Sequence, residues 1–175
     1  MRFNVAQLLK ESVGARRSYS LDDGIERLSE TGTTRVQGKI TLTRTDKGIW
    51  VTGSLEANAF TSCSRCLSPV EHPVRFKMDE EYLPKVDINT GSPLEVPEVE
   101  EGVFTLDALH TLDLTEAVRQ YVIINLPMKP LCSQSCAGLC TDCGTNLNEA
   151  ACSCAERVDS RWSPLLQLLA ATDVR

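Results

Sequence analysis

The sequence predicts an α+β fold: an antiparallel, barrel-like β meander followed by C-terminal helices and a cysteine-rich, zinc-binding region. Three observations indicate this class. Apolar and polar residues alternate between residues 35 and 78, helical spacing of apolar residues begins after residue 113, and all eight cysteines fall into two short clusters. A chain of 175 residues can bury a sizeable core without cross-links, so its cysteines are available for other chemistry.

The alternation predicts three strands. The first run covers residues 35–43 and the second covers residues 49–59, with the turn sequence Asp46-Lys47-Gly48 between them, so the two runs form a β-hairpin. A third alternating run follows at residues 70–78. The three strands form an antiparallel meander with one apolar and one polar face.

Two helices are expected after the meander. Asp113 and Glu116 resemble a capping box at the start of the first helix, and Pro127 ends it. A last helix begins at about Ser163-Pro164, where serine is the cap and proline takes the first helical position.

Charge and composition divide the chain into three parts of one compact domain: a β-rich region (1–77), an acidic, proline-rich connection (78–112) and the helical, cysteine-rich remainder (113–175). The formal net charge of −6 is uneven, because residues 78–116 carry −10 while residues 1–50 carry +3. The acidic part is expected to be a solvated connection without regular structure. The alternative is an acidic arm that binds a basic partner.

The sequence predicts a cytoplasmic protein that does not enter a membrane. It has no run of 18 apolar residues, and Lys10 and Glu11 interrupt the apolar start before any cleavage site of a signal peptide. Cysteines in a reducing compartment are metal ligands or reactive thiols more often than disulfides.

The cysteines are the candidate metal ligands. Their spacing includes two C-x-x-C pairs, which can direct two thiolates at one tetrahedral ion, and an all-sulfur set favours zinc over magnesium, calcium or manganese. Eight ligands are enough for two zinc ions. The predicted ligands are Cys63, Cys66, Cys132, Cys136, Cys140, Cys143, Cys152 and Cys154.

Sequence spacing favours one division of these ligands. The four cysteines within residues 140–154 can close one site, in which Gly144 permits the turn after the second C-x-x-C pair. Cys132 and Cys136 would then meet the distant pair at residues 63 and 66 and tie the sheet to the C-terminal region. A single site and exchanged partners remain open.

Three other cysteine chemistries were compared with structural zinc. A thioredoxin-like pair should open a helix, whereas Cys63 and Cys66 lead into a strand. An iron–sulfur cluster is compatible with four cysteines. Catalytic zinc normally includes histidine, and His72 lies on the apolar face of its predicted strand. No nucleophile, phosphate-binding or dinucleotide motif is present, so the protein is expected not to be an enzyme.

The motifs resemble those of a known family. An alternating β region ends in Cys63-Ser64-Arg65-Cys66-Leu67, and a helix runs into Leu126-Pro127-Met128-Lys129-Pro130. Residues 132–148 then read CxxxCxGLCxxCGxNLN, and Cys152-Ser153-Cys154 closes the pattern. Together they resemble the YceD family of large ribosomal RNA subunit accumulation proteins. The resemblance implies a factor without enzymatic activity that supports accumulation or processing of 23S rRNA and assembly of the large ribosomal subunit.

Two kinds of partner fit this expectation: ribosomal RNA, or a protein of large-subunit assembly. Clustered cations on the polar sheet face and the N-terminal arm could bind phosphates. The candidates are Arg16, Arg17, Arg35, Lys39, Arg44, Lys47 and Arg65, followed by Arg75 and Lys77. The acidic connection could instead bind a basic protein. The alternatives in other classes are a thiol redox or zinc-dependent enzyme and a purely structural protein-interaction module.

Overall fold

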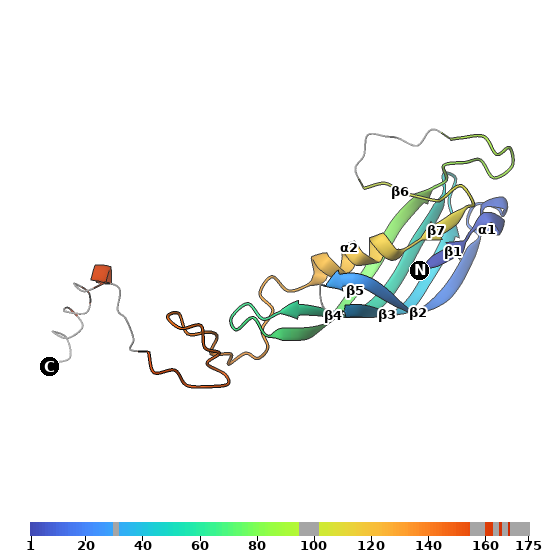
Figure 1. Ribbon diagram of the computed structural model, residues 1–175. Coiled ribbons are helices and arrows are strands. Elements are labelled where there is room, and N and C mark those ends of the chain that lie inside the picture. Colours follow the sequence, from blue (N-terminus) through green and yellow to red (C-terminus); the bar gives the residue numbers. More distant parts are fainter. Residues whose placement is uncertain (30–31, 95–101, 155–159, 163–164, 166–167, 169–175) are drawn as a thin grey trace.

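The computed structural model describes residues 1–29, 32–94, 102–154 and 160–162, together with Leu165 and Leu168. Its centre is one curved sheet of five strands in the order β2-β3-β4-β5-β6 (Figure 1). The strands are β2 (Arg16–Ser29), β3 (Gly32–Arg44), β4 (Ile49–Ser62), β5 (Pro69–Leu83) and β6 (Phe104–Thr105).

The predicted meander is confirmed by the strand pairing. β3 pairs antiparallel with β4, and β4 pairs with β5 along its whole length, from Ile49 opposite Tyr82 to Ser62 opposite Pro69. The short strand β6 adds in parallel to the end of β5. Among the described strands β2 and β6 are not hydrogen-bonded to each other, so the expected barrel-like sheet does not close.

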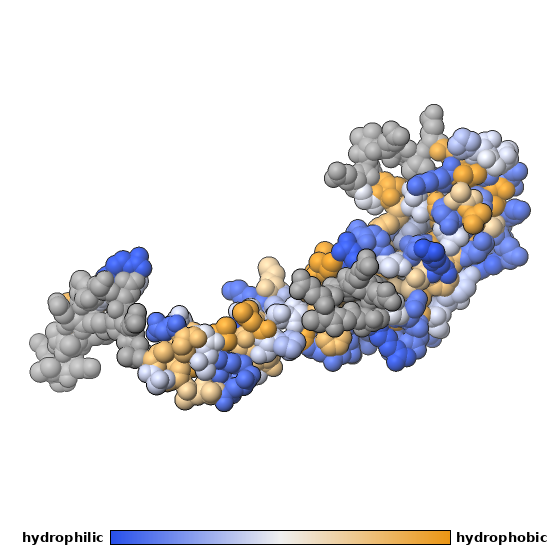
Figure 2. Space-filling view, in the orientation of Figure 1, coloured by the Kyte–Doolittle hydropathy of each residue, from blue (hydrophilic) through white to orange (hydrophobic). Residues whose placement is uncertain are grey.

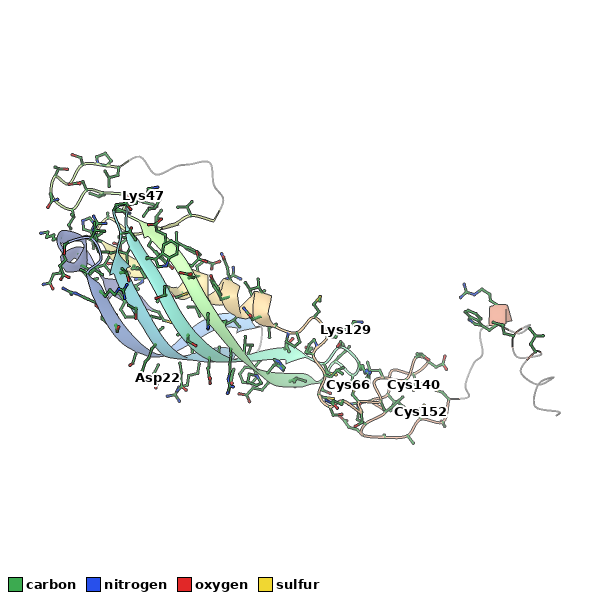
Figure 3. The ribbon with its side chains drawn as sticks, turned by 180° about the vertical axis from the view of Figure 1, so that it is seen from behind. Asp22, Lys47, Cys66, Lys129, Cys140 and Cys152 are labelled. Carbon is green, nitrogen blue, oxygen red and sulfur yellow. The ribbon has the colours of Figure 1, made fainter. Side chains whose placement is uncertain are left out.

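One face of the sheet is covered by the rest of the fold (Figures 1 and 3). The two-stranded sheet of β1 (Arg2–Asn4) and β7 (Thr111–Asp113) lies there with the helices α1 (Ala6–Lys10) and α2 (Thr115–Asn125). Alternation in the strands places the buried apolar side chains of the sheet on this face. The core includes Val36, Ile40, Leu42, Ile49, Val51, Leu55, Val74, Phe76, Met78 and Tyr82 from the sheet and Ala117, Val118 and Val122 from α2.

Strand β5 extends further than the sequence indicated. The acidic connection was expected to lack regular structure from residue 78, but the strand continues to Leu83, with Met78 and Tyr82 buried in the core. Apolar residues keep the spacing of a strand there, but the acidic residues between Met78 and Tyr82 obscure the pattern in the sequence. The Tyr82 hydroxyl donates to the carbonyl oxygen of Asp113 at 3.2 Å and links the strand to the second layer.

Helix α2 lies where the sequence placed it, but its start is different. Asp113 Oδ1 accepts hydrogen bonds from the backbone N–H of Thr115 at 2.9 Å and from its hydroxyl at 2.6 Å. Glu116 instead binds the Arg119 guanidinium, so the predicted capping box is wrong. The helix ends as predicted, because Leu126 is extended ahead of Pro127.

The predicted last helix at Ser163-Pro164 falls mainly outside the described residues. The structure describes a short 3-10 helix immediately before it, at Ser160–Trp162. Of the described helices, none combines the length and apolar character that crossing a bilayer requires.

The curved sheet depends on a close backbone contact at Gly38. This residue has φ +151°, and a Cβ atom added to it would lie 2.3 Å from the carbonyl oxygen of Ser54 on β4. We expect Gly38→Ala to lower the free energy of unfolding by about 2 kcal/mol or more, because backbone atoms would have to separate. Urea denaturation would measure the loss.

Gly91→Ala is the matched control for this substitution. Gly91 also has a positive φ, +71°, but an added Cβ would meet nothing within 4 Å. The free energy of unfolding of Gly91→Ala should therefore fall only by the conformational cost of about 1 kcal/mol. Equal losses for the two variants would contradict the importance of the contact between β3 and β4.

Candidate metal centre

The first C-x-x-C pair forms a tight turn between β4 and β5. The backbone N–H of Cys63 donates to the carbonyl of Ser68 at 2.8 Å, and that of Leu67 donates to the carbonyl of Cys63 at 2.9 Å. The N–H of Arg65 is directed at Cys63 Sγ, 3.5 Å away. These bonds curl the chain around the sulfur, and we call residues 63–68 the first knuckle.

Residues 140–145 repeat the geometry and form the second knuckle. Cys140 N–H donates to the Thr145 carbonyl at 2.8 Å, and Gly144 N–H donates to the Cys140 carbonyl at 2.9 Å. The residue after the second cysteine has a positive φ in both knuckles, 59° at Leu67 and 72° at Gly144. The predicted role of Gly144 in the turn is confirmed, and Leu67 adopts the same conformation despite its side chain.

Centre 1 brings the first knuckle together with Cys132 and Cys136. All four ligand atoms lie within 4.8 Å of one another, and Cys63, Cys66 and Cys136 are buried. The Sγ atoms of Cys63 and Cys136 are 3.8 Å apart, and those of Cys66 and Cys132 are 3.6 Å apart. Four sulfurs about 2.3 Å from a central ion in a tetrahedron are about 3.8 Å apart, so these residues fit a single tetrahedral ion.

The peptide after α2 is held against the first knuckle by the backbone as well as by the sulfurs. Both the N–H and the hydroxyl of Ser64 donate to the carbonyl oxygen of Pro130, each at 2.8 Å. This contact brings Cys132 to the end of the β4–β5 hairpin, about 65 residues along the chain from the cysteines it joins.

Centre 2 is formed within one short segment. Cys140 and Cys143 of the second knuckle meet Cys152 and Cys154, again with all four sulfurs within 4.8 Å. This centre is more exposed than centre 1, because none of its four cysteines is buried. The structure therefore groups the sulfurs in the division that the sequence favoured, rather than in one site or with exchanged partners; metal binding itself stays a prediction.

Hydrogen bonds in the knuckles favour thiolates. The backbone N–H groups of Cys66 and Arg65 lower the pKa of Cys63 to about 6. The Ser68 hydroxyl lowers the pKa of Cys66, and the Thr145 hydroxyl, 3.1 Å from Cys143 Sγ, lowers the pKa of that cysteine to about 6. Each knuckle therefore supplies a sulfur ligand, Cys63 or Cys143, that ionises near neutral pH.

The opposite cysteines have raised pKa values because negative sulfurs crowd around them. Contact with Cys136 and Cys66 raises the pKa of Cys132 to about 12. Contact with Cys143 and Cys140 raises that of Cys154 to about 12. A dication at the centre of each group would offset this repulsion and displace the remaining protons.

Histidine is absent from both described sulfur groups. Four protein ligands close a tetrahedral site, whereas catalytic zinc keeps one position for water. His72 is half-buried on the face of β5 that the sequence assigned to it. The arrangement can therefore hold an ion and fasten chain segments together, and nothing in it prepares a bound water for attack.

Two of the predicted RNA-binding cations have structural roles. Arg44 is half-buried and donates to the carbonyls of Leu9 and Gly48, so it fastens α1 to the β3–β4 turn. Arg17 binds Glu11 and Gln7 beside α1. Arg17 lies opposite Leu42, and Arg44 is two residues further along the same strand, so both are on the covered side of the sheet and not on its polar face.

Three further cations are engaged by neighbours. Arg35 forms two hydrogen bonds with Asp22, at 2.7 and 2.8 Å, and holds the pKa of that carboxyl at about 2. Arg75 pairs with Glu56. Arg65 donates to the carbonyl of Cys136 at 2.9 Å and joins the two halves of centre 1.

The other candidates do not gather into one basic patch. Arg16 and Lys39 are exposed on the outer sheet face, where Lys77 also lies in the row of Lys39. Lys47 lies at the end of the sheet opposite the labelled cysteines (Figure 3). The outer positions of the described strands carry charges of both signs, so the polar face is not a basic surface. The acidic members are Asp22, Glu56, Glu71, Asp79 and Glu81.

The polar residues that support the sulfurs were not predicted from the sequence. Ser68 and Thr145 occupy the same position, two residues after the second cysteine of each knuckle. Asn148 donates to Cys136 Sγ at 3.4 Å. The repeated hydroxyl could have been found by aligning the two knuckles, but the amide contact depends on how the chain folds back.

The fold and the site define a class: a β-sheet protein with two cysteine-only knuckle centres, one of which closes the end of a β-hairpin. The chain belongs to the YceD family, whose model, described as large ribosomal RNA subunit accumulation protein YceD, matches residues 51–169. The match covers β4 and β5, helix α2 and both centres.

Similar proteins occur in bacteria and plants. An uncharacterised protein of Mycobacterium tuberculosis is 33% identical over 123 residues, which are 70% of this chain and 56% of that protein. An uncharacterised protein of Mycobacterium leprae is 30% identical over 123 residues, or 70% and 54% of the two chains. The matched region thus spans little more than half the length of these relatives.

A plant relative carries a functional name. The large ribosomal RNA subunit accumulation protein YCED homolog 1, chloroplastic, of Arabidopsis thaliana is 33% identical over 55 residues, which are 31% of this chain and 17% of that protein. No solved structure matches the chain.

The residue after the second cysteine is leucine in the first knuckle and glycine in the second, and this difference gives a prediction. Leu67 is 65% exposed, so Leu67→Gly removes little packing and relieves a left-handed conformation. We expect this variant to gain about 1 kcal/mol of stability in the metal-loaded protein. Gly144→Ala, where an added Cβ meets nothing within 4 Å, should lose a similar amount. Thermal unfolding would measure both, and a destabilised Leu67→Gly variant would contradict the argument.

The raised pKa values give the second prediction. Thiols with a pKa of about 12 keep their protons at pH 7, so loading each centre should release at least one proton, from Cys132 and from Cys154. Ion affinity should therefore fall as the pH is lowered. Calorimetry in two buffers with different ionisation enthalpies would count the protons, and Cys132→Ser should release fewer. A count of zero for the natural chain would contradict this assignment.

Proposed function

We propose that this protein is a cytoplasmic factor without enzymatic activity that binds two zinc ions and supports accumulation of large-subunit ribosomal RNA by binding a protein of large-subunit assembly. The observation that carries the proposal is the pair of four-sulfur centres within the segment that matches the family. The description of the family supports the ribosomal role. The closed ligand sets support a structural rather than a catalytic use of the ions.

The sulfur spacing supports a single ion over an iron–sulfur cluster. In a [4Fe–4S] cluster each cysteine binds a different iron, and in a [2Fe–2S] cluster two cysteines bind each iron, so sulfurs on different irons must be further apart than the edge of a tetrahedron around one atom. All four sulfurs of centre 1 lie within 4.8 Å of one another, which suits one atom. Zinc is the common ion for four thiolates in a structural site.

Charge supports a protein partner over direct contact with RNA. Two Zn²⁺ ions bring four positive charges to eight thiolates, so loading both centres lowers the formal net charge from −6 to −10. Several cations of the predicted basic surface are paired or fasten the fold. A strongly negative chain repels phosphates but attracts basic proteins, which are abundant in the large subunit.

An exposed apolar surface beside centre 1 also fits a protein partner. Ile124, in the last turn of α2, is 72% exposed, and Met128, between α2 and Cys132, is fully exposed. Figure 2 shows hydrophobic residues at this end of α2. Exposed apolar side chains surrounded by polar ones are typical of surfaces that bind another protein.

A thiol redox enzyme is the alternative that one observation favours, the low pKa of Cys63, about 6. Reactive cysteines must also be reached by a substrate, and Cys63 is completely buried. Rapid thiol labelling of the metal-loaded native protein would support the enzyme, whereas slow labelling would support closed centres.

The proposal can be tested in cells that lack the protein. We expect the ratio of 23S to 16S rRNA to fall and the natural chain to restore it, whereas Cys63→Ser should fail because centre 1 opens. Crosslinking in cells, followed by identification of bound RNA and proteins, would identify the partner. An unchanged rRNA ratio in the deleted strain would refute the ribosomal role.

Two charge variants separate the partners. Replacing Glu95, Glu98, Glu100 and Glu101 by Gln should reduce crosslinking to a basic protein. Replacing Arg16, Lys39 and Lys77 by Ala should leave the rRNA ratio unchanged, and it should preserve the melting temperature because exposed charges contribute little to stability. If the second variant alone lost function, RNA rather than a protein would be the partner.

A further inference from the structure

The two centres are joined by hydrogen bonds that neither cluster needs for its own closure. Asn148 lies in the segment that connects the second knuckle to Cys152, and its amide Nδ2 donates to Cys136 Sγ of centre 1 at 3.4 Å. Its Oδ1 accepts from the backbone N–H of Ala137 at 2.8 Å. One side chain of the centre 2 segment thus contacts both the sulfur ligand of centre 1 and the peptide that follows it.

The position of Asn148 is fixed by the loop of centre 2. Leu147 N–H donates to the carbonyl of Gly138 at 2.9 Å, so the chain folds back directly before Asn148. Asn146 accepts from the N–H of Asn148 at 3.1 Å and from its amide at 2.7 Å. The second knuckle closes the same loop, because Cys140 N–H binds the carbonyl of Thr145.

The same loop packs against the first knuckle. Asn146 Nδ2 lies 3.5 Å from the hydroxyl of Ser68. An added Cβ on Gly138 would lie 3.3 Å from the carbonyl oxygen of Arg65, which shows how closely the two backbones approach. Residues 138–148, which include two ligands of centre 2, therefore pack against the first knuckle of centre 1, and we call them the wedge.

We infer that Asn148 is a positioning residue through which an ion in centre 2 strengthens ion binding in centre 1. An ion in centre 2 fixes the second knuckle and with it the wedge, so that the amide is already directed at Cys136 when centre 1 binds its ion. An N–H group directed at a thiolate stabilises its negative charge, as outer hydrogen bonds do in other metal sites. Because coupling between sites is reciprocal, an ion in centre 1 strengthens centre 2 equally.

The inference rests on the proposed metal binding, and the test uses the full chain loaded with Cd²⁺, which reports each centre as a separate ¹¹³Cd resonance. Cys63→Ser and Cys154→Ser assign the resonances. Asn148→Asp keeps an oxygen that accepts from Ala137 but replaces the donating amide by a negative oxygen. We expect it to weaken centre 1 about tenfold in competition with a chelator and to shift only the centre 1 resonance.

Coupling is measured by emptying centre 2. Replacing both Cys152 and Cys154 by Ser should lower the ion affinity of centre 1 by about the same tenfold. Adding Asn148→Asp to this variant should cause little further loss, because both changes remove the same interaction. Asn125→Asp makes the same chemical change at the exposed end of α2 and should leave both centres unchanged.

Three results would overturn the inference. The first is an unchanged Cd²⁺ affinity of centre 1 in Asn148→Asp, and the second is an unchanged affinity of centre 1 after centre 2 is emptied. The third is a combined variant in which the two losses of affinity multiply. A natural chain that binds no Cd²⁺ would refute the proposed metal binding, and the coupling with it. Normal loading of both centres without an effect of Asn148→Asp would refute the coupling alone.

Discussion

The convergence of four sulfurs at the end of the β4–β5 hairpin is the contact on which the organisation of this molecule depends. Cys63 and Cys66 come from the turn of the hairpin, whereas Cys132 and Cys136 follow helix α2. The helix is packed along the sheet by apolar side chains, but few of the described residues past Asn125 are buried. Centre 1 and the bonds of Ser64 to Pro130 hold that part in place.

Two regions of the molecule are stabilised by different interactions. The sheet, α1 and α2 share a conventional apolar core, which needs no ion. The segment from Cys132 to Cys154 is short, polar and mostly exposed, so it cannot bury enough apolar surface to fix its own conformation. Metal–thiolate bonds are the interaction suited to such a segment, as in other small cysteine-rich modules.

Charge adds a second constraint that connects the site to the proposed partner. Each four-thiolate centre keeps two negative charges when it holds a dication, and the outer sheet face has cations and acids in adjacent positions. Because Arg17, Arg44 and Arg65 form bonds within the fold, fewer cations remain that could contact phosphate. An acidic factor with an exposed apolar surface beside centre 1 is better matched to a basic protein than to RNA.

The sequence by itself determined the strands of the meander and the place and end of helix α2, because these depend on local periodicity, and it favoured the division of the cysteines that the structure shows. The sequence could not reveal β1, β6 and β7, because these strands are too short to show a hydrophobic period. It also missed the C-terminal end of β5, where acidic residues interrupt the apolar pattern.

Tertiary structure alone decided which charges are exposed and which groups support the sulfurs. Arg44 became a structural residue because α1 folds over it, and Asn148 met Cys136 because the loop of centre 2 turns back at Gly138. Both contacts join residues whose side chains carry no local signal of their partner. Only the fold brings them within hydrogen-bonding distance, which is why spacing could predict the ligands but not the residues that position them.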